Sequence, residues 1–537
     1  MLDSSKPRLR VGLLVDSATT SAWQYAAIKN CADLIDITTV IQCENSRTDK
    51  NLLKNCLYYF LNLISIKNSQ TKQVPLHQLL SNQFELISFK CQSDGPWQSL
   101  DDLTMSKIDQ QNLDVIIKIG MNLIRDPQKI SSKYGVLSFH HGDPQFFRGR
   151  PAGFYELLFG ASAVGAVVQQ LSNKLDAGTI RAFGRYKIVS HSYRKTLEQL
   201  FRNSSMLLRL ALINCSKGIE IEIVKSGTNY HLPRNSRVLK FGLIVTWRKI
   251  NRFFFGLFQR RSWKIAELKS INLNSEDQFL NLETNSLLKC PPEISFMADP
   301  FLLPGGGIIF EAAKKNSVLG RLMTLKDGCH KIINTSFFGI EQHLSFPFVI
   351  QENGKTFVMP EMAEHGSQQL LELDQNQNVT NKHHLLGLEH EKLIDPILLH
   401  QDSNWWLFAG RRGTEFDHLF LWSSSNLFGP YKEHQMNPIV IDPSRARNGG
   451  AILRIDNELF RVGQNNCREY GDGITVSKIT RLDHDDFREE PTTSLKLSGL
   501  HGPHTFSTNG EIFYIDCYKT VFDPVAWLAR FKHWSSK

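Results

Sequence analysis

Residues 135–160 read GVLSFHHGDPQFFRGRPAGFYELLFG, and residues 161–180 continue with ASAVGAVVQQLSNKLDAGTI. An apolar run ends in a His-His pair, a Pro turn and an Arg-Gly-Arg-Pro segment follow, and then come a helix, a strand and an Asp-Ala-Gly turn. This order places His140 and Asp176 at the ends of different elements. A parallel sheet gathers its active site at such ends, so the stretch predicts an α/β domain with a site along one sheet edge.

The same stretch resembles the folate-dependent formyltransferases. Their pattern is Asn-x-His after an apolar strand, then Pro-x-x-Arg-Gly, and further on Leu-Asp-x-Gly-x-Ile. The residues that agree with it are His140, Pro144, Arg148, Gly149, Pro151, Leu175, Asp176, Gly178 and Ile180. Ser138 stands where the family has Asn. The resemblance implies catalytic roles for His140, Asp176 and Ser138. Arg148 is either a substrate-anion contact or a brace of its loop.

The activity implied by this resemblance is transfer of a formyl group from N10-formyltetrahydrofolate to an amine. In the family the His and the Asn stabilise the oxyanion, and the Asp accepts the proton of the amine. Loss of one oxyanion donor costs on the order of 3 kcal/mol, so Ser138 predicts a slower enzyme. We expect an amino-sugar substrate, nucleotide-linked or lipid-linked, in polysaccharide biosynthesis. A degenerate domain that only binds is the alternative.

Strand-like and helix-like segments alternate from Arg8 to about residue 230. Such alternation predicts a Rossmann-like parallel sheet. No Gly-x-Gly-x-x-Gly follows the first strand, so a dinucleotide is not expected. The family binds its folate beside the strand that residues 114–120 resemble, and the resemblance therefore implies backbone contacts to the pterin from Gly120, Met121 and Asn122.

Residues 231–290 are expected to form a basic and apolar linker between two domains. Its apolar residues can share one face of a helix, with Arg248, Lys249 and Arg252 away from that face. This pattern favours a helix over about 240–262 that lies in a membrane interface, and its central charges argue against a spanning helix. A linker helix packed between the domains is the alternative.

The pattern of residues 291–525 is all-β, with many short apolar runs separated by turn residues. Met297-Ala-Asp-Pro-Phe, Leu344-Ser-Phe-Pro-Phe and Leu393-Ile-Asp-Pro-Ile recur at intervals of 47 and 49 residues, by subtraction of their first positions. That period matches one propeller blade, and similar openings near Ser444 and Gly499 predict five blades. The fold class predicted for the chain is therefore an α/β Rossmann-like formyltransferase domain (1–230) followed by an all-β five-bladed propeller.

The propeller region resembles the propellers of arabinanases, xylosidases and fructosidases. More closely, MADPF, SFPFVIQENGKTFVMPE, IDPILLHQDSNWWLFAG and GPYKEHQMNPIVIDPSRARNGG resemble the N-terminal region of plant glucosamine inositolphosphorylceramide transferases. Asp299 and Asp395 match the general base and the pKa-modulating Asp of the first resemblance, whereas its acid has no match. Glu361 is either a substitute for that acid or a solvated residue at a strand end, and all three are candidate substrate-binding residues. Where a glycosidase blade opens with Glu-Gly-Pro, this chain has Arg447-Asn448-Gly449.

Glycosidase chemistry needs two carboxyl groups across the scissile bond, and the acid of that pair has no match in this chain. We therefore expect a propeller that recognises a glycan. Two alternatives stay open. One is a non-catalytic glycan-binding scaffold, and the other is a glycosidase or glycosyl-transfer activity seated in the propeller.

Composition limits the partners and the location. A net charge of +9 spread along the chain favours a phosphorylated substrate or an anionic membrane over nucleic acid. Nine cysteines without metal-binding spacing predict a reducing compartment and no structural metal. The N-terminal residues lack the apolar core of a signal peptide, so we expect a cytoplasmic protein.

Overall fold

The computed structural model describes residues 7–46, 52–80, 83–173, 178–223, 225–269, 279–315, 317, 319–335, 343–364, 366–528 and 530. The chain divides into two compact units, residues 1–249 and 250–537, which are treated separately below. The division falls inside a long helix, α7 (Asn235–Phe258), and not at residue 230. No helix in the described part of the chain is both long enough and apolar enough to cross a membrane.

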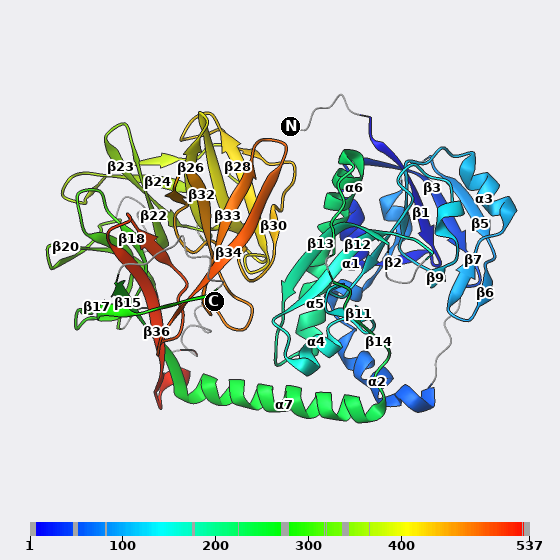
Figure 1. Cartoon of the computed structure of the whole chain (residues 1–537), viewed down its shortest axis with the longest axis horizontal. Helices are drawn as coiled ribbons and strands as arrows, with labels where there is room; N and C mark the ends of the chain where they lie inside the picture. The colour runs from blue at the N-terminus through cyan, green and yellow to red at the C-terminus, as the bar shows by residue number, and fades with distance from the viewer. Residues whose placement is uncertain are drawn as a thin grey trace. The chain divides into compact units, whose positions relative to one another are not determined.

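Unit 1 is built on a seven-stranded sheet (Figure 1). In spatial order its strands are β13 (Thr179–Lys187), β12 (Ala163–Gln170), β10 (Val136–His140), β8 (Val115–Lys118), β1 (Leu9–Val15), β3 (Ile35–Cys43) and β5 (Glu85–Phe89). The five strands from β10 to β5 are parallel to one another. β12 pairs antiparallel with β10, and β13 pairs antiparallel with β12. The apolar runs of the parallel strands are buried, as expected for an α/β sheet.

Helices and short hairpin strands complete unit 1. The helices are α1 (Ala22–Lys29), α2 (Leu52–Ser65), α3 (Asp102–Asp109), α4 (Phe154–Phe159), α5 (Tyr193–Ser204) and α6 (Leu207–Lys217). The short strands are β2 (Thr19–Ser21), β4 (Gln73–Pro75), β6 (Gln92–Asp94), β7 (Trp97–Ser99), β9 (Leu123–Ile124), β11 (Phe147–Gly149) and β14 (Thr228–Tyr230). Local signals set the helix ends: the Asp101 carboxylate accepts from the Thr104 N–H, and Gly218 closes α6 with φ +68°. The alternating α/β order expected from the sequence is confirmed.

Unit 2 contains five β-sheets within its described residues. The first sheet has β18 (Ile294–Leu302), β19 (Ile308–Lys314), β20 (Arg321–Lys326) and β21 (Cys329–Ile332). The second has β22 (Ser345–Glu352), β23 (Lys355–Glu361), β24 (Gln369–Leu373) and β25 (Val379–His384). The third has β26 (Leu393–Gln401), β27 (Asn404–Arg411), β28 (His418–Ser424), β29 (Lys432–Glu433) and β30 (Val440–Ile441). The fourth has β31 (Leu453–Ile455), β32 (Glu458–Gln464), β33 (Ile474–Leu482), β34 (Phe487–Leu497) and β16 (Phe279–Leu282). The fifth has β35 (Phe506–Thr508), β36 (Phe513–Phe522), β15 (Gln259–Leu268) and β17 (Thr284–Leu287).

The inner edges of these five sheets are joined in a ring by hydrogen bonds. Asp299 of the first sheet accepts from the Phe346 N–H of the second (3.2 Å), and Glu361 of the second accepts from the Asp395 N–H of the third (3.3 Å). The Asn448 amide then donates to the Asp395 carbonyl (2.8 Å). The Phe506 N–H donates to the Gly449 carbonyl (2.7 Å), and the Asp299 N–H donates to Asp516 (3.1 Å), which closes the ring. The five-bladed propeller expected from the sequence repeat is thus what the described residues form.

Residues assigned to the linker from their composition belong in part to the propeller. β15 and β17 are the outer strands of the fifth blade, and β16 is the outer strand of the fourth. The pairing of β15 with β36 runs from Gln259–Phe522 to Glu267–Tyr514. Chain segments from the two ends of the unit therefore share one blade, whereas the helical part of the expected linker, α7, lies outside the sheets.

Candidate functional site

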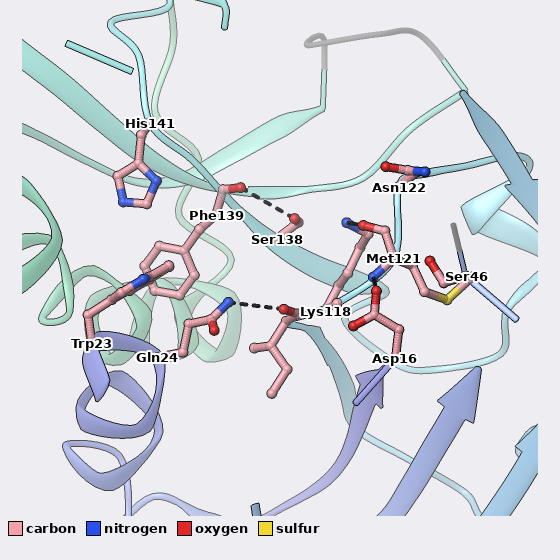
Figure 2. Close-up of a pocket in the computed structure, with 12 residues that line it drawn as sticks. Asp16, Trp23, Gln24, Ser46, Lys118, Met121, Asn122, Ser138, Phe139 and His141 are labelled. Atoms are coloured by element: carbon pink, nitrogen blue, oxygen red, sulfur yellow. Dashed lines mark hydrogen bonds between the residues drawn. The ribbon is translucent and has the colours of Figure 1, made fainter. Parts of the chain in front are cut away.

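Unit 1 carries a cavity of about 430 Å³ at the carboxyl ends of β1 and β8 (Figure 2). Lys118 and Ser138 line it from the sheet, and Asp16 lines it from the end of β1. The Lys118 ammonium group donates to the Met121 carbonyl (3.1 Å). Burial lowers the pKa of Lys118 from 10.5 to about 8, and the Asp16 carboxylate opposes this shift. The cavity is thus polar at its base and holds an amine with a lowered pKa.

The residues expected to hold a folate, Gly120, Met121 and Asn122, do line this cavity. Their N–H groups, however, already donate within the protein. Gly120 donates to the Leu14 carbonyl (3.3 Å), Met121 to the Asp16 carboxylate (2.7 Å) and Asn122 to the Gln98 amide oxygen (2.8 Å). These residues therefore do not fit a pterin held by their N–H groups, and we derive no step through formyl-tetrahydrofolate.

The expected catalytic residues of unit 1 are only partly brought together. Ser138 lines the cavity, and its hydroxyl contacts the Phe139 carbonyl at 3.4 Å. His140 ends β10 but is not among the residues that line the cavity, whereas His141 is. Burial lowers the pKa of His141 to about 3, so this ring is neutral at neutral pH. Asp176 lies outside the described residues.

Arg148, expected to contact a substrate anion, hydrogen-bonds to the Ser226 hydroxyl. It lies on β11, which pairs with β14 through Arg148 and Asn229. In this structure Arg148 therefore joins two surface strands, and it does not line the 430 Å³ cavity.

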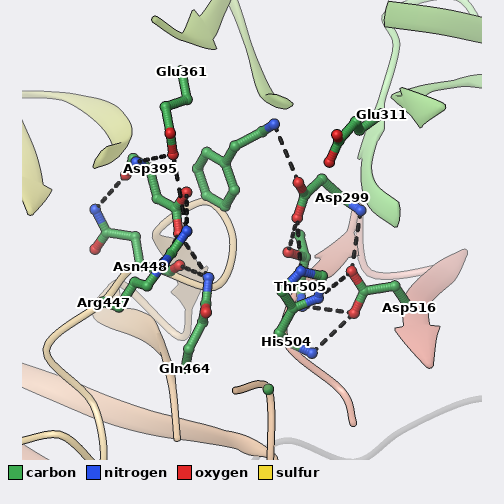
Figure 3. Close-up of polar contacts among 12 residues, drawn as sticks. Asp299, Glu311, Glu361, Asp395, Arg447, Asn448, Gln464, His504, Thr505 and Asp516 are labelled. Carbon is green, nitrogen blue, oxygen red and sulfur yellow. Dashed lines mark hydrogen bonds and ion pairs between the residues drawn. The ribbon is translucent and has the colours of Figure 1, made fainter. Parts of the chain in front are cut away.

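The propeller places a second cluster of polar groups at its centre (Figure 3). Asp299, Phe346 and Asp395 occupy the same position of the three sequence repeats, immediately before a proline. Their φ angles are +54°, +44° and +46°, and each lies at a shift in strand register. A left-handed residue in a bulge redirects its side chain, and such strain concentrates at functional sites. The repeat thus turns two aspartates toward the centre.

One side of the centre is an ion pair. The Arg447 guanidinium donates to both carboxylate oxygens of Asp395, at 2.6 and 3.2 Å, and the Gln464 amide donates to the same carboxylate at 2.7 Å. Arg447 also lies against the rings of Phe416 and Tyr470. Burial alone would lower the pKa of Arg447, but the Asp395 charge raises it well above its ordinary value. Both carboxylate oxygens of Asp395 are thus engaged by hydrogen bonds from Arg447 and Gln464.

The other side is a buried group of two aspartates and a histidine. His504 pairs with Asp516 and lies 3.5 Å from Asp299, and Thr505 donates to Asp299 at 2.6 Å. Burial raises the pKa of Asp299 to about 6, an effect that the His504 charge opposes. One ligand atom each from Asp299, His504 and Asp516 lie within 4.8 Å of one another, so these residues could hold a metal ion.

Two glutamates complete the centre. Burial, first, and the neighbouring carboxylates, second, raise the pKa values of Glu311 and Glu361 well above the ordinary value. Arg447 opposes the shift of Glu361 from 3.9 Å. The centre therefore gathers Glu311 and Glu361, whose protonated forms burial favours, beside Asp299, whose carboxylate can accept a proton.

Sequence reasoning found only part of this centre. It selected Asp299, Glu361 and Asp395, and the structure brings all three together. It missed Glu311, a lone acid in the apolar strand IIFEAA, and His504, which opens the last blade; those two local irregularities were the available signals. Trp405, Trp406 and Trp422 are buried in the blade core.

These features define a five-bladed propeller with a buried carboxyl centre, and comparisons with known proteins agree for this region. Residues 283–506 match the family described as glucosamine inositolphosphorylceramide transferase 1, N-terminal. Glucosamine inositolphosphorylceramide transferase 1 of Arabidopsis thaliana is 34% identical over 219 residues, 38% of this chain and 28% of that protein. The protein of the same name from Oryza sativa subsp. japonica is 31% identical over 214 residues, 37% of this chain and 28% of that protein. The chain thus spans little more than a quarter of these relatives.

Solved structures resemble each unit at low identity. The GH43 protein BlXynB of Bacillus licheniformis has a TM-score of 0.29 and 17% identity, over 37% of this chain and 45% of that one. An α-L-arabinanase of Cellvibrio cellulosa has a TM-score of 0.29 and 12% identity, over 39% of this chain and 85% of that one. Glycinamide ribonucleotide transformylase 1 of Symbiobacterium toebii has a TM-score of 0.27 and 13% identity, over 42% of this chain and 95% of that one.

The curated relatives overturn the activity predicted from the sequence. They are named as glucosamine inositolphosphorylceramide transferases, not as folate-dependent formyltransferases. The predictions of formyl transfer as the function, and of a one-carbon transferase as the enzyme class, are therefore wrong. The formyltransferase motif in residues 138–180 was the source of the error, because that motif was read as the activity of the whole chain.

Proposed function

We propose that the propeller of this chain acts in glycosyl transfer involving an amino sugar and a lipid-linked acceptor. The match of residues 283–506 to the named transferases supports the substrate class. The observation that carries the chemistry is the gathering of several carboxyl groups, two of them with pKa values raised well above the ordinary value, in one buried centre. Glycosyl transfer needs a group that donates a proton to the leaving oxygen and a group that accepts the proton of the attacking hydroxyl.

Roles follow from the protonation states. Glu361, whose pKa is raised well above its ordinary value by burial and by the Asp395 charge, is the proton donor. Asp299, with a pKa of about 6, is ionised above that pH and is the proton acceptor. Asp395 takes no proton in this scheme, since Arg447 and Gln464 occupy both of its oxygens; it orients the guanidinium instead.

The test uses the full chain, a radiolabelled glucosamine glycoside with an alcohol leaving group as the sugar donor, and vesicles that contain inositolphosphorylceramide, with transfer of label to the lipid as the readout. Glu361→Gln keeps a neutral side chain of the same shape, so folding should be preserved while transfer falls by about 10²-fold or more. Glu364→Gln on the same blade is the matched control, because its carboxylate is 45% exposed. Transfer by Glu361→Gln at the wild-type rate would refute the assigned role.

A glycan-binding propeller without turnover is the second candidate, and the complete engagement of Asp395 by Arg447 favours it. Calorimetry with the same lipid vesicles separates the two. Binding by the wild type without label transfer supports the second candidate, and absence of both binding and transfer contradicts the two together.

For unit 1 we infer a Rossmann-like fold related to that of formyltransferases, and this inference concerns the fold alone. It is supported by the parallel order of β10, β8, β1, β3 and β5 and by the agreement of residues 138–151 with the formyltransferase pattern. A crystal structure of residues 1–249 would test it by the position of β10 next to β8.

A further inference from the structure

Unit 2 exposes a group of large apolar side chains at the C-terminal half of α7 and the segment that follows β36. Their exposed fractions lie between 37% and 74%. We call the following residues the apolar surface: Phe253, Phe254, Phe258, Phe522, Trp527 and Leu528. Exposed aromatic residues in such a group are unusual for a protein surface in water and mark an interaction site.

Two segments far apart in the sequence form this surface together (Figure 1). The Phe258 and Phe522 rings stack with centroids 6.3 Å apart, and the Asp523 N–H donates to the Phe258 carbonyl at 2.7 Å. The Arg530 guanidinium donates to the Gln259 carbonyl at 2.8 Å. These bonds fix the C-terminal segment against the end of α7, so the surface is one built element and not two loose chain ends.

The charge around the apolar surface is mainly positive. Residues 231–266 contain nine Lys or Arg and no Asp or Glu, by count along the sequence. Arg252, Arg260 and Arg530 are exposed. Arg260 pairs with Asp523 at 3.0 Å. Burial, first, and the nearby positive charge of Arg252, second, lower the pKa of Arg530. Aromatic rings edged by cations match the polarity of a bilayer interface with anionic headgroups.

We propose that the apolar surface docks unit 2 on an anionic lipid bilayer. The aromatic rings would enter the boundary between headgroups and acyl chains, and Arg252 and Arg530 would meet the headgroup phosphates. The helical pattern alone had suggested an interfacial helix. The surface adds the C-terminal Phe522, Trp527 and Leu528, and it does not depend on whether the propeller centre transfers sugar.

The experiment is flotation of the full chain with vesicles of phosphatidylcholine, with or without phosphatidylserine. The wild type should float with phosphatidylserine vesicles, and added salt should weaken this binding because exposed charges are screened. The double variant Phe254→Ser, Trp527→Ser should lower partitioning by about tenfold or more. Phe279→Ser is the matched control, since Phe279 is 65% exposed in the same unit but outside the surface.

Circular dichroism keeps the test interpretable, because only variants with the wild-type spectrum are compared. Equal flotation of the double variant and the wild type overturns the proposal. The proposal is also overturned if sedimentation velocity shows that the wild type is a dimer and the double variant a monomer, while neither binds vesicles. A second copy of the chain would then cover the surface. A wild type that binds both vesicle types equally overturns the charge part, and Arg252→Glu should then have no effect.

Discussion

Glu156 of unit 1 and Glu489 of the propeller are both deeply buried glutamates, and their carboxyl groups behave in opposite ways. Burial, with a contribution from the Asp143 charge, raises the pKa of Glu156 from 4.5 to about 8. Burial also acts on Glu489, but the Arg461 and Arg445 guanidiniums outweigh it and lower the pKa of that carboxyl. Arg461 donates to both of its oxygens, at 2.7 and 2.6 Å. An interior carboxylate stays charged only where the fold supplies a counter-charge.

The same contrast separates the two candidate sites. The propeller centre fixes one ion pair, Asp395 with Arg447, by direct contacts, beside carboxyl groups whose pKa values burial raises. The cavity of unit 1 shifts Lys118 and His141 toward their neutral forms, mainly through burial. A chemistry that depends on fixed charges therefore fits the propeller better than unit 1.

The largest effect should come from breaking the central ion pair. Arg447→Met leaves Asp395 buried without its cation, and loss of one partner of a buried pair costs about 3–5 kcal/mol of stability. Urea unfolding followed by tryptophan fluorescence measures it. Arg412→Met is the control, because Arg412 and Glu364 are 46% and 45% exposed and such a pair contributes little. Equal losses in the two variants would show that Arg447 and Asp395 are not buried together in solution.

A smaller effect, with the opposite sign, is expected at Glu156. Its folded-state pKa is raised to about 8, so stability that is complete below pH 4.5 is lost as the pH rises through 8. The side chain of Glu156→Gln stays neutral at every pH. This variant should therefore raise the free energy of unfolding by on the order of 2 kcal/mol above pH 8 and leave it unchanged below pH 4.5. Thermal unfolding across this pH range is the measurement. Glu85→Gln is the control, because Glu85 is an exposed residue of β5. A gain that does not change with pH would contradict the assignment.

The smallest effect concerns Lys118. Its folded-state pKa is lowered to about 8, so stability that is complete above pH 10.5 is lost as the pH falls through 8. Lys118→Met should therefore raise the free energy of unfolding by about 1 kcal/mol below pH 8 and leave it unchanged above pH 10.5. This pH profile is the reverse of that of Glu156→Gln. Lys107→Met on exposed α3 provides the comparison. A loss of stability at every pH would mean that the bond to the Met121 carbonyl outweighs the burial of the amine.

The sequence by itself determined the local features of both units. Apolar runs and caps placed β1, β3, β8 and β10, since a strand buried on both faces must be apolar along its length. The spacing of the repeats around Asp299, Phe346 and Asp395 predicted the blades, because each blade is one local unit of antiparallel strands. The same repeats selected two of the central acids, Asp299 and Asp395.

What only the tertiary structure decided depends on contacts between residues far apart in the chain. The pairing of β15 with β36 joins residues 259–267 to residues 514–522, and no local pattern encodes such a partner. Arg447 meets Asp395 from 52 positions away, and Thr505 meets Asp299 from 206 positions away. The protonation of Glu311 and Glu361 likewise depends on burial and on acids from other blades. Burial and charge act through space, so these properties become fixed only when the ring of blades is closed.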